Sequence, residues 1–318
     1  MLNKIKKGCL YLAGCCMAQL VHAQQRTALF NTREFTFTTE NDAYLFQKKD
    51  AYYTNGFAFT LRTAGEKKGV RVMHTYELGQ KIYTPLLRKT TGPQDIDRPY
   101  CGYLYAQYTQ TRFPVGDAIL QYGATIGQVG PYSLGENVQS SYHKMLGYAR
   151  FTGWQYQVQN SLGADLSIRY ARTVLQDSSL FKWVPVAEAS VGSNFTYARL
   201  GAYLCVGIFE KNQQSALWNA RIQRNGSRQE RSYELFGYWY PQVLLQGYNV
   251  TVEGGLFSKG SGAVLGDPQR VMFQQHFGLC YASGKISANL ALVIQSRETT
   301  SQINLQRYGS VQLSYRFH

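Results

Sequence analysis

The stretch "FTFTTENDAYLFQKKDAYYTNGFAFTL", residues 35–61, contains two alternating runs separated by an unusually polar connection. Phe35 and Phe37 alternate with threonines in the first run, and Phe57 and Phe59 alternate with smaller residues in the second. A period of two predicts β-strands with one apolar face, so the two runs predict a hairpin. A turn needs only one or two polar residues. The other polar and aromatic residues between the runs need a different explanation.

The same alternation recurs along the rest of the chain. Further runs occur at 70–83, 100–109, 118–128, 162–172, 184–191, 195–207, 232–240, 271–282, 286–294 and 310–317. With the opening hairpin they predict about twelve strands, an even number, as in single-chain bacterial barrels. The fold class predicted is all-β: a transmembrane antiparallel β-barrel.

Composition supports a barrel in the outer membrane. The chain has 25 Tyr and 30 Gly, only 16% of its residues are charged, and its mean hydropathy is −0.31. No segment approaches 18 consecutive apolar residues, which excludes a transmembrane helix. Aromatic girdles and polar lumen residues produce this composition in outer-membrane barrels.

The N-terminus predicts export. Lys4, Lys6 and Lys7 precede a short apolar core, and a cleavage site ends at Ala23. We therefore expect a signal peptide at 1–23 and a barrel domain at 24–318. The alternative is lipoprotein processing at Cys15, after Leu-Ala-Gly.

Charge and cysteine content exclude several classes of function. Removal of 1–23 lowers the net charge from +14 to +11, but export and the absence of any nucleic-acid motif make a nucleic-acid partner unexpected. The spacing of Cys101, Cys205 and Cys280 fits neither a disulfide framework nor a metal site. We therefore expect these three cysteines to be small apolar residues of the barrel wall.

Connections alternate between short and long, with the long ones expected outside the cell. The turns 192–194 and 282–285 are short, whereas 47–51, 84–99, 130–159, 210–231 and 254–270 are long. The alternating strand near Phe317 resembles C-terminal strands read by the barrel-assembly machinery. We expect a monomer.

The loop at 130–159 contains a predicted helix over 134–147, with Gly147 as its stop. Its predicted apolar face carries Val138, Tyr142, Met145 and Leu146. Gln139 and His143 lie four residues apart on a neighbouring face.

Taken alone, the candidate site residues also have ordinary structural interpretations. His143 can accept a proton from water near neutral pH, or it can be an exposed loop histidine. Asn41 and Asp42 can orient an imidazole, bind Ca²⁺ or simply end a strand. Thr54 is expected on the lumen-side face, with Gly56.

Basic residues of the long loop at 84–99 are candidate ligands for lipid phosphates. Arg88, Lys89 and Arg98 lie in this loop, and solvated loop charges are the alternative. The sequence has no Gly-x-Ser-x-Gly and no His-Glu-x-x-His motif. In a hydrolase, water would therefore be the more natural nucleophile.

Six ordered motifs together resemble one family. They are "ENDAYLFQKKDAYYTNG" (40–56), "IYTP" (82–85), "DRPYCGYLY" (97–105), "GQVGP" (127–131), "VQSSYH" (138–143) and "GWQYQVQN" (153–160). The chain resembles the outer-membrane lipid A 3'-O-deacylases over its mature length, although its last third matches only as barrel. The resemblance implies a twelve-stranded barrel with its site between the wall and a loop helix. It also implies Ca²⁺-dependent hydrolysis of the 3'-acyloxyacyl ester of lipid A, the lipid anchor of lipopolysaccharide.

Residue roles follow from this resemblance. His143 is similar to the general base, and Asp42 to the calcium-binding carboxylate. Asn41 and Thr54 would support the site and the oxyanion, and Gln139 matches a glutamine of the family. Arg88 and Lys89 occupy the loop that carries a basic pair in the family.

One departure concerns the metal. The family has an acidic residue shortly after the histidine, but 144–157 contains no Asp or Glu, and the expected position is near Ala149. Glu40, Asp50 or Glu136 could substitute. A catalytically inactive barrel with a binding or structural role, and a small pore, are the alternatives to an esterase.

Overall fold

The computed structural model describes residues 30–45, 51–67, 69–177, 180–224, 231–258 and 262–318. The predicted signal peptide, Cys15 and Asp50 lie outside these ranges. The strands are β1 (Arg33–Asn41), β2 (Tyr52–Lys67), β3 (Val70–Thr84), β4 (Cys101–Arg112), β5 (Ala118–Val129), β6 (Ser161–Arg172), β7 (Leu175–Asp177), β8 (Phe181–Gly192), β9 (Phe195–Ile208), β10 (Tyr233–Asn249), β11 (Val271–Ser283), β12 (Ile286–Gln295) and β13 (Gln306–Phe317). The helices are α2 (Gly135–Leu146), α3 (Val250–Glu253), η1 (Asp42–Leu45), η2 (Pro93–Asp95), η3 (Pro131–Ser133), η4 (Trp154–Tyr156) and η5 (Ala216–Trp218).

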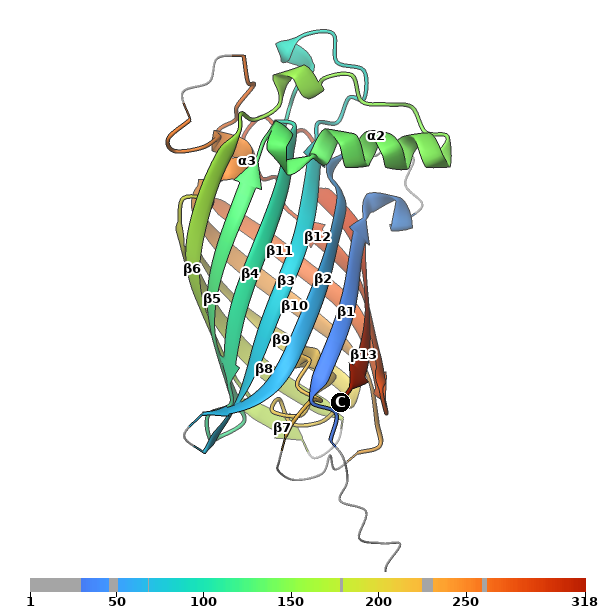
Figure 1. Cartoon of the computed structure of the whole chain (residues 1–318), viewed down its shortest axis with the longest axis vertical. Helices are drawn as coiled ribbons and strands as arrows, with labels where there is room; N and C mark the ends of the chain where they lie inside the picture. The colour runs from blue at the N-terminus through green and yellow to red at the C-terminus, as the bar shows by residue number, and fades with distance from the viewer. Residues whose placement is uncertain (1–29, 46–50, 68, 178–179, 225–230, 259–261) are drawn as a thin grey trace, which may run out of the picture. The chain divides into compact units, whose positions relative to one another are not determined.

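The strands form a closed antiparallel barrel (Figure 1). β1 pairs with β13, and β6 pairs with β8, which completes a ring of twelve long strands; the three-residue β7 pairs only with β8. Closure gives each of the twelve long strands a partner on both sides, as hydrocarbon requires. The predicted all-β barrel with a loop helix is confirmed. Within the described ranges, no helix is both long and apolar enough to span a membrane.

Alternation along the strands separates a lipid-facing surface from the lumen. On β3, Tyr76 and Leu78 are half exposed, whereas Thr75 and Glu77 line the lumen. The three cysteines Cys101, Cys205 and Cys280 are buried and unbridged, as expected of small wall residues. A polar lumen cavity of about 430 Å³ lies within the ring.

Two connections lie at the rim opposite to the one predicted. The long connection after β9 lies at the rim where β1 begins and β13 ends, and the turn between β8 and β9 lies at the rim that carries α2. The predictions for 210–231 and 192–194 were therefore wrong. The reason is that antiparallel strands alternate between the two rims, so the place of a connection in the strand order decides its rim and its length does not.

The connection after β9 folds back into the barrel instead of projecting outward. Part of it joins inward residues from strands around the ring in one buried apolar cluster: Ala64, Met73, Phe113, Ile119, Ala171, Val184, Val186, Trp218, Ala220, Ile222 and Tyr240. This cluster fills one end of the lumen. A lumen filled in this way does not suit the alternative of an open pore.

Buried charges anchor the inward-folded residues 210–224, called the plug below, to the barrel wall. Arg71 of β3 donates hydrogen bonds to the carbonyls of Gln213, Ala220 and Ile222. Glu234 of β10 accepts four hydrogen bonds from the plug, from two backbone N–H groups, a hydroxyl and a guanidinium.

Glu234→Ala removes the acceptor shared by these four buried donors. We expect it to lower the free energy of unfolding by about 3–5 kcal/mol, the usual cost of breaking a buried charged network. Urea unfolding of the barrel refolded in lipid vesicles measures this loss. Glu66→Ala, at the exposed end of β2, is the control, and an equal midpoint for the two variants would contradict the anchoring role.

Candidate active site

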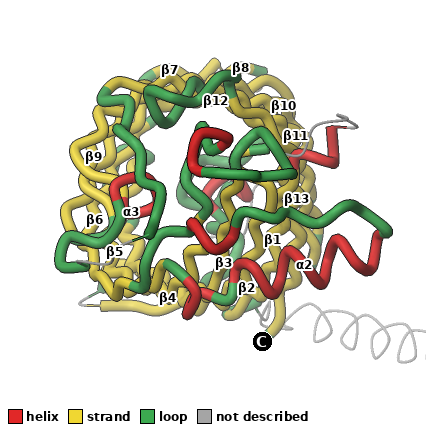
Figure 2. Tube along the Cα trace, turned by 90° about the horizontal axis from the view of Figure 1, so that it is seen from above, coloured by secondary structure: helices red, strands yellow, loops and turns green. Residues whose placement is uncertain are grey.

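Helix α2 lies across the outside of the barrel at the rim above β2, β3 and β4 (Figures 1 and 2). It approaches the wall closely at Gly102, where an added Cβ would lie 2.8 Å from the Cα of Gly135. Only glycine at both positions permits this contact. At the other end, Gly147 adopts φ 73° and donates to the carbonyls of His143 and Lys144, so the predicted helix stop is confirmed.

The buried face of α2 is polar. Gln139 and His143 are 1% and 2% exposed, whereas Met145 is 73% exposed. Val138 packs at the edge of an apolar cluster under the helix. The predicted apolar face was therefore wrong for Met145, because the wall beneath the helix offers polar partners to the neighbouring face.

One hydrogen bond orients the imidazole of His143. Its Nδ1 lies 2.7 Å from the carbonyl oxygen of Ala149, and the rings of Tyr148 and Phe151 lie 5.8 and 5.7 Å away. A carbonyl only accepts, so Nδ1 carries the hydrogen and Nε2 is the basic nitrogen of the neutral ring. A backbone carbonyl thus orients the histidine, close to the position where the resemblance implied an acidic residue.

Thr54 faces α2 and not the lumen. The register of β2 against β3 shifts between Tyr53 and Asn55, which is a bulge at Thr54. The bulge places Tyr53 in the lumen, bonded to Glu40, while the Thr54 hydroxyl lies 3.3 Å from the carbonyl of Ile82 and 3.4 Å from Nε2 of Gln139. The predicted lumen-side position was wrong because this extra residue reverses the alternation at the strand's start.

Asn41 and Asp42 occupy the end of β1 beside this bulge. The Asn41 amide donates to Asn55, its cross-strand neighbour, and its oxygen accepts from the N–H of Ala43 at 2.6 Å. Asp42 is buried and accepts from the N–H of Ala51 at 2.8 Å. The structure therefore brings Asn41, Thr54 and Gln139 to one outer part of the wall, with Asp42 at its edge.

A cleft of about 490 Å³ opens beside Asp42. It is lined by Asp42, Ala51, Tyr52, Leu86, Ile303, Asn304, Leu305, Gln306 and Arg307. Tyr52 holds a left-handed φ of 69°, which is strained for this residue type. Its hydroxyl donates to Asp97 at 2.7 Å and accepts from the N–H of Asn304 at 3.0 Å. Sequence analysis missed Tyr52 and Asn55 as site residues, because only the bulge and the strained backbone single them out.

Two of the three predicted phosphate-binding residues lie near this site. The Arg88 guanidinium lies 6.0 Å from the ring of Phe151, which itself packs on His143, and Lys89 is exposed. The same aromatic cluster contains Tyr100, whose pKa is raised by burial, so its phenol stays neutral.

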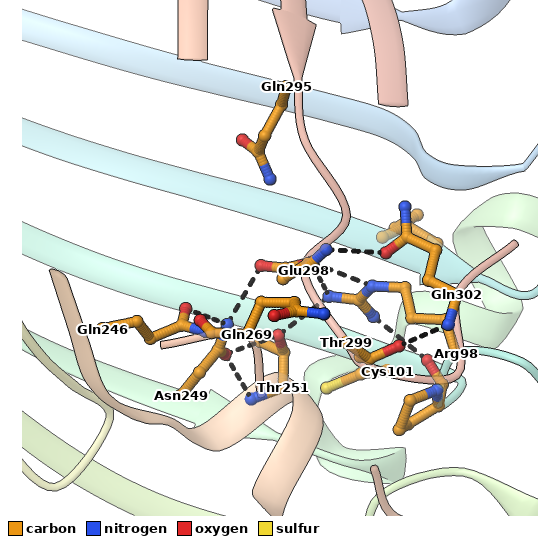
Figure 3. A network of polar contacts seen from close by, with 12 residues as sticks. Arg98, Cys101, Gln246, Asn249, Thr251, Gln269, Gln295, Glu298, Thr299 and Gln302 are labelled. Carbon is orange, nitrogen blue, oxygen red and sulfur yellow. Dashed lines mark hydrogen bonds and ion pairs between the residues drawn. The ribbon is translucent and has the colours of Figure 1, made fainter. Parts of the chain in front are cut away.

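Arg98 lies elsewhere, in a network at the mouth of the lumen (Figure 3). It is fully buried, donates to Glu298 at 2.6 and 3.0 Å and to Thr251 at 3.0 Å, and lies 3.9 Å from the ring of Tyr83. Asn249 bonds the other oxygen of Glu298. The predicted contact between Arg98 and a lipid phosphate does not fit this position, because its donors are committed inside the barrel.

Fold and site together define an outer-membrane β-barrel whose polar site faces outward, beneath a helix, rather than into the lumen. A family model described as outer membrane protein LpxR matches residues 10–317. The chain belongs to this family, the outer-membrane lipid A 3'-O-deacylases, as its motifs indicated.

Solved structures agree on the fold. LpxR from Salmonella typhimurium is 17% identical, with a TM-score of 0.72 over 90% of this chain and 100% of that chain. The β domain of the Bordetella autotransporter Brka is 12% identical, with a TM-score of 0.52 over 90% of this chain and 100% of that chain. Among curated proteins, no sequence matched. At these identities the likeness shows the fold alone.

Thr54→Val removes the hydroxyl between the wall and Gln139 while keeping the side chain's shape. We expect amides of α2 to exchange hydrogen about tenfold faster, because one of the polar contacts that dock the helix is lost. Hydrogen exchange with mass spectrometry on the folded barrel measures this. Thr63→Val, lower on the same strand, is the control. Unchanged exchange in α2 would show that Thr54 does not hold the helix.

Proposed function

We propose that this protein hydrolyses the ester that links the 3'-acyloxyacyl group to lipid A. The observation that carries the proposal is His143, buried on the inner face of α2 with Nδ1 bonded to a carbonyl. Its basic Nε2 would act as a general base, one helical turn from Gln139, which contacts Thr54 of the wall.

The reaction follows from these groups. His143 Nε2 accepts a proton from water, and the resulting hydroxide attacks the ester carbonyl to form a tetrahedral oxyanion. Amide or hydroxyl donors of Asn41 and Thr54 stabilise that oxyanion. When the intermediate collapses, the bond between the acyl carbon and the sugar oxygen breaks, and the imidazolium returns its proton to the departing sugar oxygen. The products are the free acyloxyacyl acid and the 3'-hydroxyl of lipid A.

Basic residues at the rim position the substrate in this proposal. Arg88 and Lys89 would pair with the phosphates of lipid A, which carries negative charge at the level of the headgroups. Helix α2 and the barrel rim would then hold the ester at the boundary between the lipid headgroups and the hydrocarbon. We expect a monomer to be sufficient, since the site residues come from one chain.

Calcium is the proposed cofactor, and the oxygen donors suit it in type. Asp42 would supply a carboxylate, and Asn41, Thr54 and Gln139 would supply uncharged oxygens; among the described residues, the buried Oε1 of Gln139 has no hydrogen-bond partner. Within the described ranges, however, no group of three His, Cys, Asp or Glu side chains could hold a metal. One carboxylate favours weak binding, and a bound Ca²⁺ would supply positive charge for the oxyanion.

The alternative is a barrel that has lost activity and binds lipid A without cleaving it. The absence of any Asp or Glu from 144–157, after His143, is the observation that favours it.

His143→Ala separates the two functions. We expect release of the 3'-acyloxyacyl group to fall by about 10²–10⁴-fold, the usual contribution of a general base. Mass spectrometry of lipid A from cells expressing each variant measures the release, and heat-modifiable migration confirms folding. His74→Ala, bonded to Tyr108 on another part of the wall, is the control. If lipid A is unchanged by the folded wild-type protein, the inactive barrel is correct.

Calcium binding tests the cofactor separately from activity. We expect calorimetry on the refolded barrel to give a Kd of about 10⁻⁴–10⁻³ M, in the range of weak extracellular sites. Asp42→Asn should weaken binding at least tenfold by removing the carboxylate, and Ala149→Glu should tighten it by adding one. Equal affinities in all three proteins would exclude a calcium site at Asp42.

A further inference from the structure

A shallow apolar groove of about 560 Å³ crosses the lipid-facing wall next to the site. Its floor spans β10 to β13, and η1 forms its upper edge. The lining residues are Tyr44, Leu45, Gly237, Tyr238, Phe277, Gly278, Leu279, Leu290, Ala291, Leu292, Gly309, Ser310 and Val311. None of them is charged.

Two outward-facing glycines mark the ends of the groove, one of them covered by η1 and the other open. Gly309 lies directly under η1, and a Cβ at this position would lie 2.9 Å from Cβ of Tyr44. At the other end, Gly237 has no neighbouring atom closer than 3.8 Å to an added Cβ, so the space above it is open. Leucine and phenylalanine side chains stand between these two positions.

The register of the sheet connects this groove to the site. Asn41 pairs with Gly309 on one side and with Asn55 on the other, so the end of the groove is the next position along the same row. The row continues through Leu292 and Phe277. The upper edge of the groove also adjoins the site, because η1 begins at Asp42 and contributes Tyr44 and Leu45 to the groove.

We propose that this groove binds an acyl chain of the lipid whose ester reacts at His143. The inference rests on the proposed function and adds to it a subsite that sets chain-length preference. An uncharged, apolar furrow that starts at the polar site suits one hydrocarbon chain. From Gly309 to Gly237 it crosses three strand spacings, about 14 Å.

The first experiment fills the far end of the groove. Gly237→Phe should lower kcat/KM about tenfold for lipid A with a long 3'-acyl group and leave a substrate with a shortened group unchanged. Ala124→Phe, on the exposed outer face of β5, is the control and should affect neither substrate. Equal loss on both substrates, or no loss on the long one, would overturn the subsite.

The second experiment does not depend on hydrolysis. Lipid A with a photoreactive group at the end of its acyl chain is bound to the His143→Ala variant in excess phospholipid, and cross-linked peptides are mapped. We expect cross-links to concentrate in 271–295 and 306–317, and to fall when Gly237→Phe is added. Labelling spread evenly over the lipid-facing wall would overturn the groove. If wild type shows no hydrolysis but labelling is still concentrated here, the proposed reaction fails and the acyl subsite stands.

Discussion

The pairing of every strand edge within the ring is the constraint on which the rest of the structure depends. Hydrocarbon offers no partner for backbone N–H and C=O groups, so β1 must pair with β13 as well as with β2. This closure fixes Asn41 between Asn55 and Gly309, which are 254 positions apart in the chain by their numbers. The candidate site and the groove are neighbours because of the register of β1 with β2 and β13.

Docking of α2 is the second step, and it depends on the first. A helix of twelve residues is marginal by itself in water, so its position comes from the wall that it covers. The Gly102–Gly135 contact brings the helix close enough for Gln139 to reach Thr54. The bulge in β2 is equally necessary, since without it the Thr54 hydroxyl would face the lumen.

Sequence patterns predicted the strands, which repeat along the chain, and missed single local features such as the bulge in β2. Every strand has lipid on one side and the lumen on the other, which imposes an alternation of period two. The twelve strands could therefore be predicted from the sequence. The bulge at Thr54 adds a single residue and leaves no compositional trace. Burial of Arg98 depends on Glu298, 200 residues away, and the plug depends on Arg71 and Glu234 meeting a loop that looks solvent-exposed in sequence. Such pairings exist only once the ring has closed.

The absence of an acidic side chain near Ala149 separates the orientation of His143 from the binding of a metal. Orientation of His143 needs only an acceptor at Nδ1, and the Ala149 carbonyl supplies one. Holding a metal needs negative charge, which this carbonyl cannot supply, so the proposed calcium site would be weak while the proposed base would keep its orientation. An apolar helix face against the wall would dock α2 without burying an imidazole and an amide, whose desolvation costs free energy unless hydrogen bonds offset it. The buried polar face of α2 is therefore better explained by chemistry at this position than by docking alone.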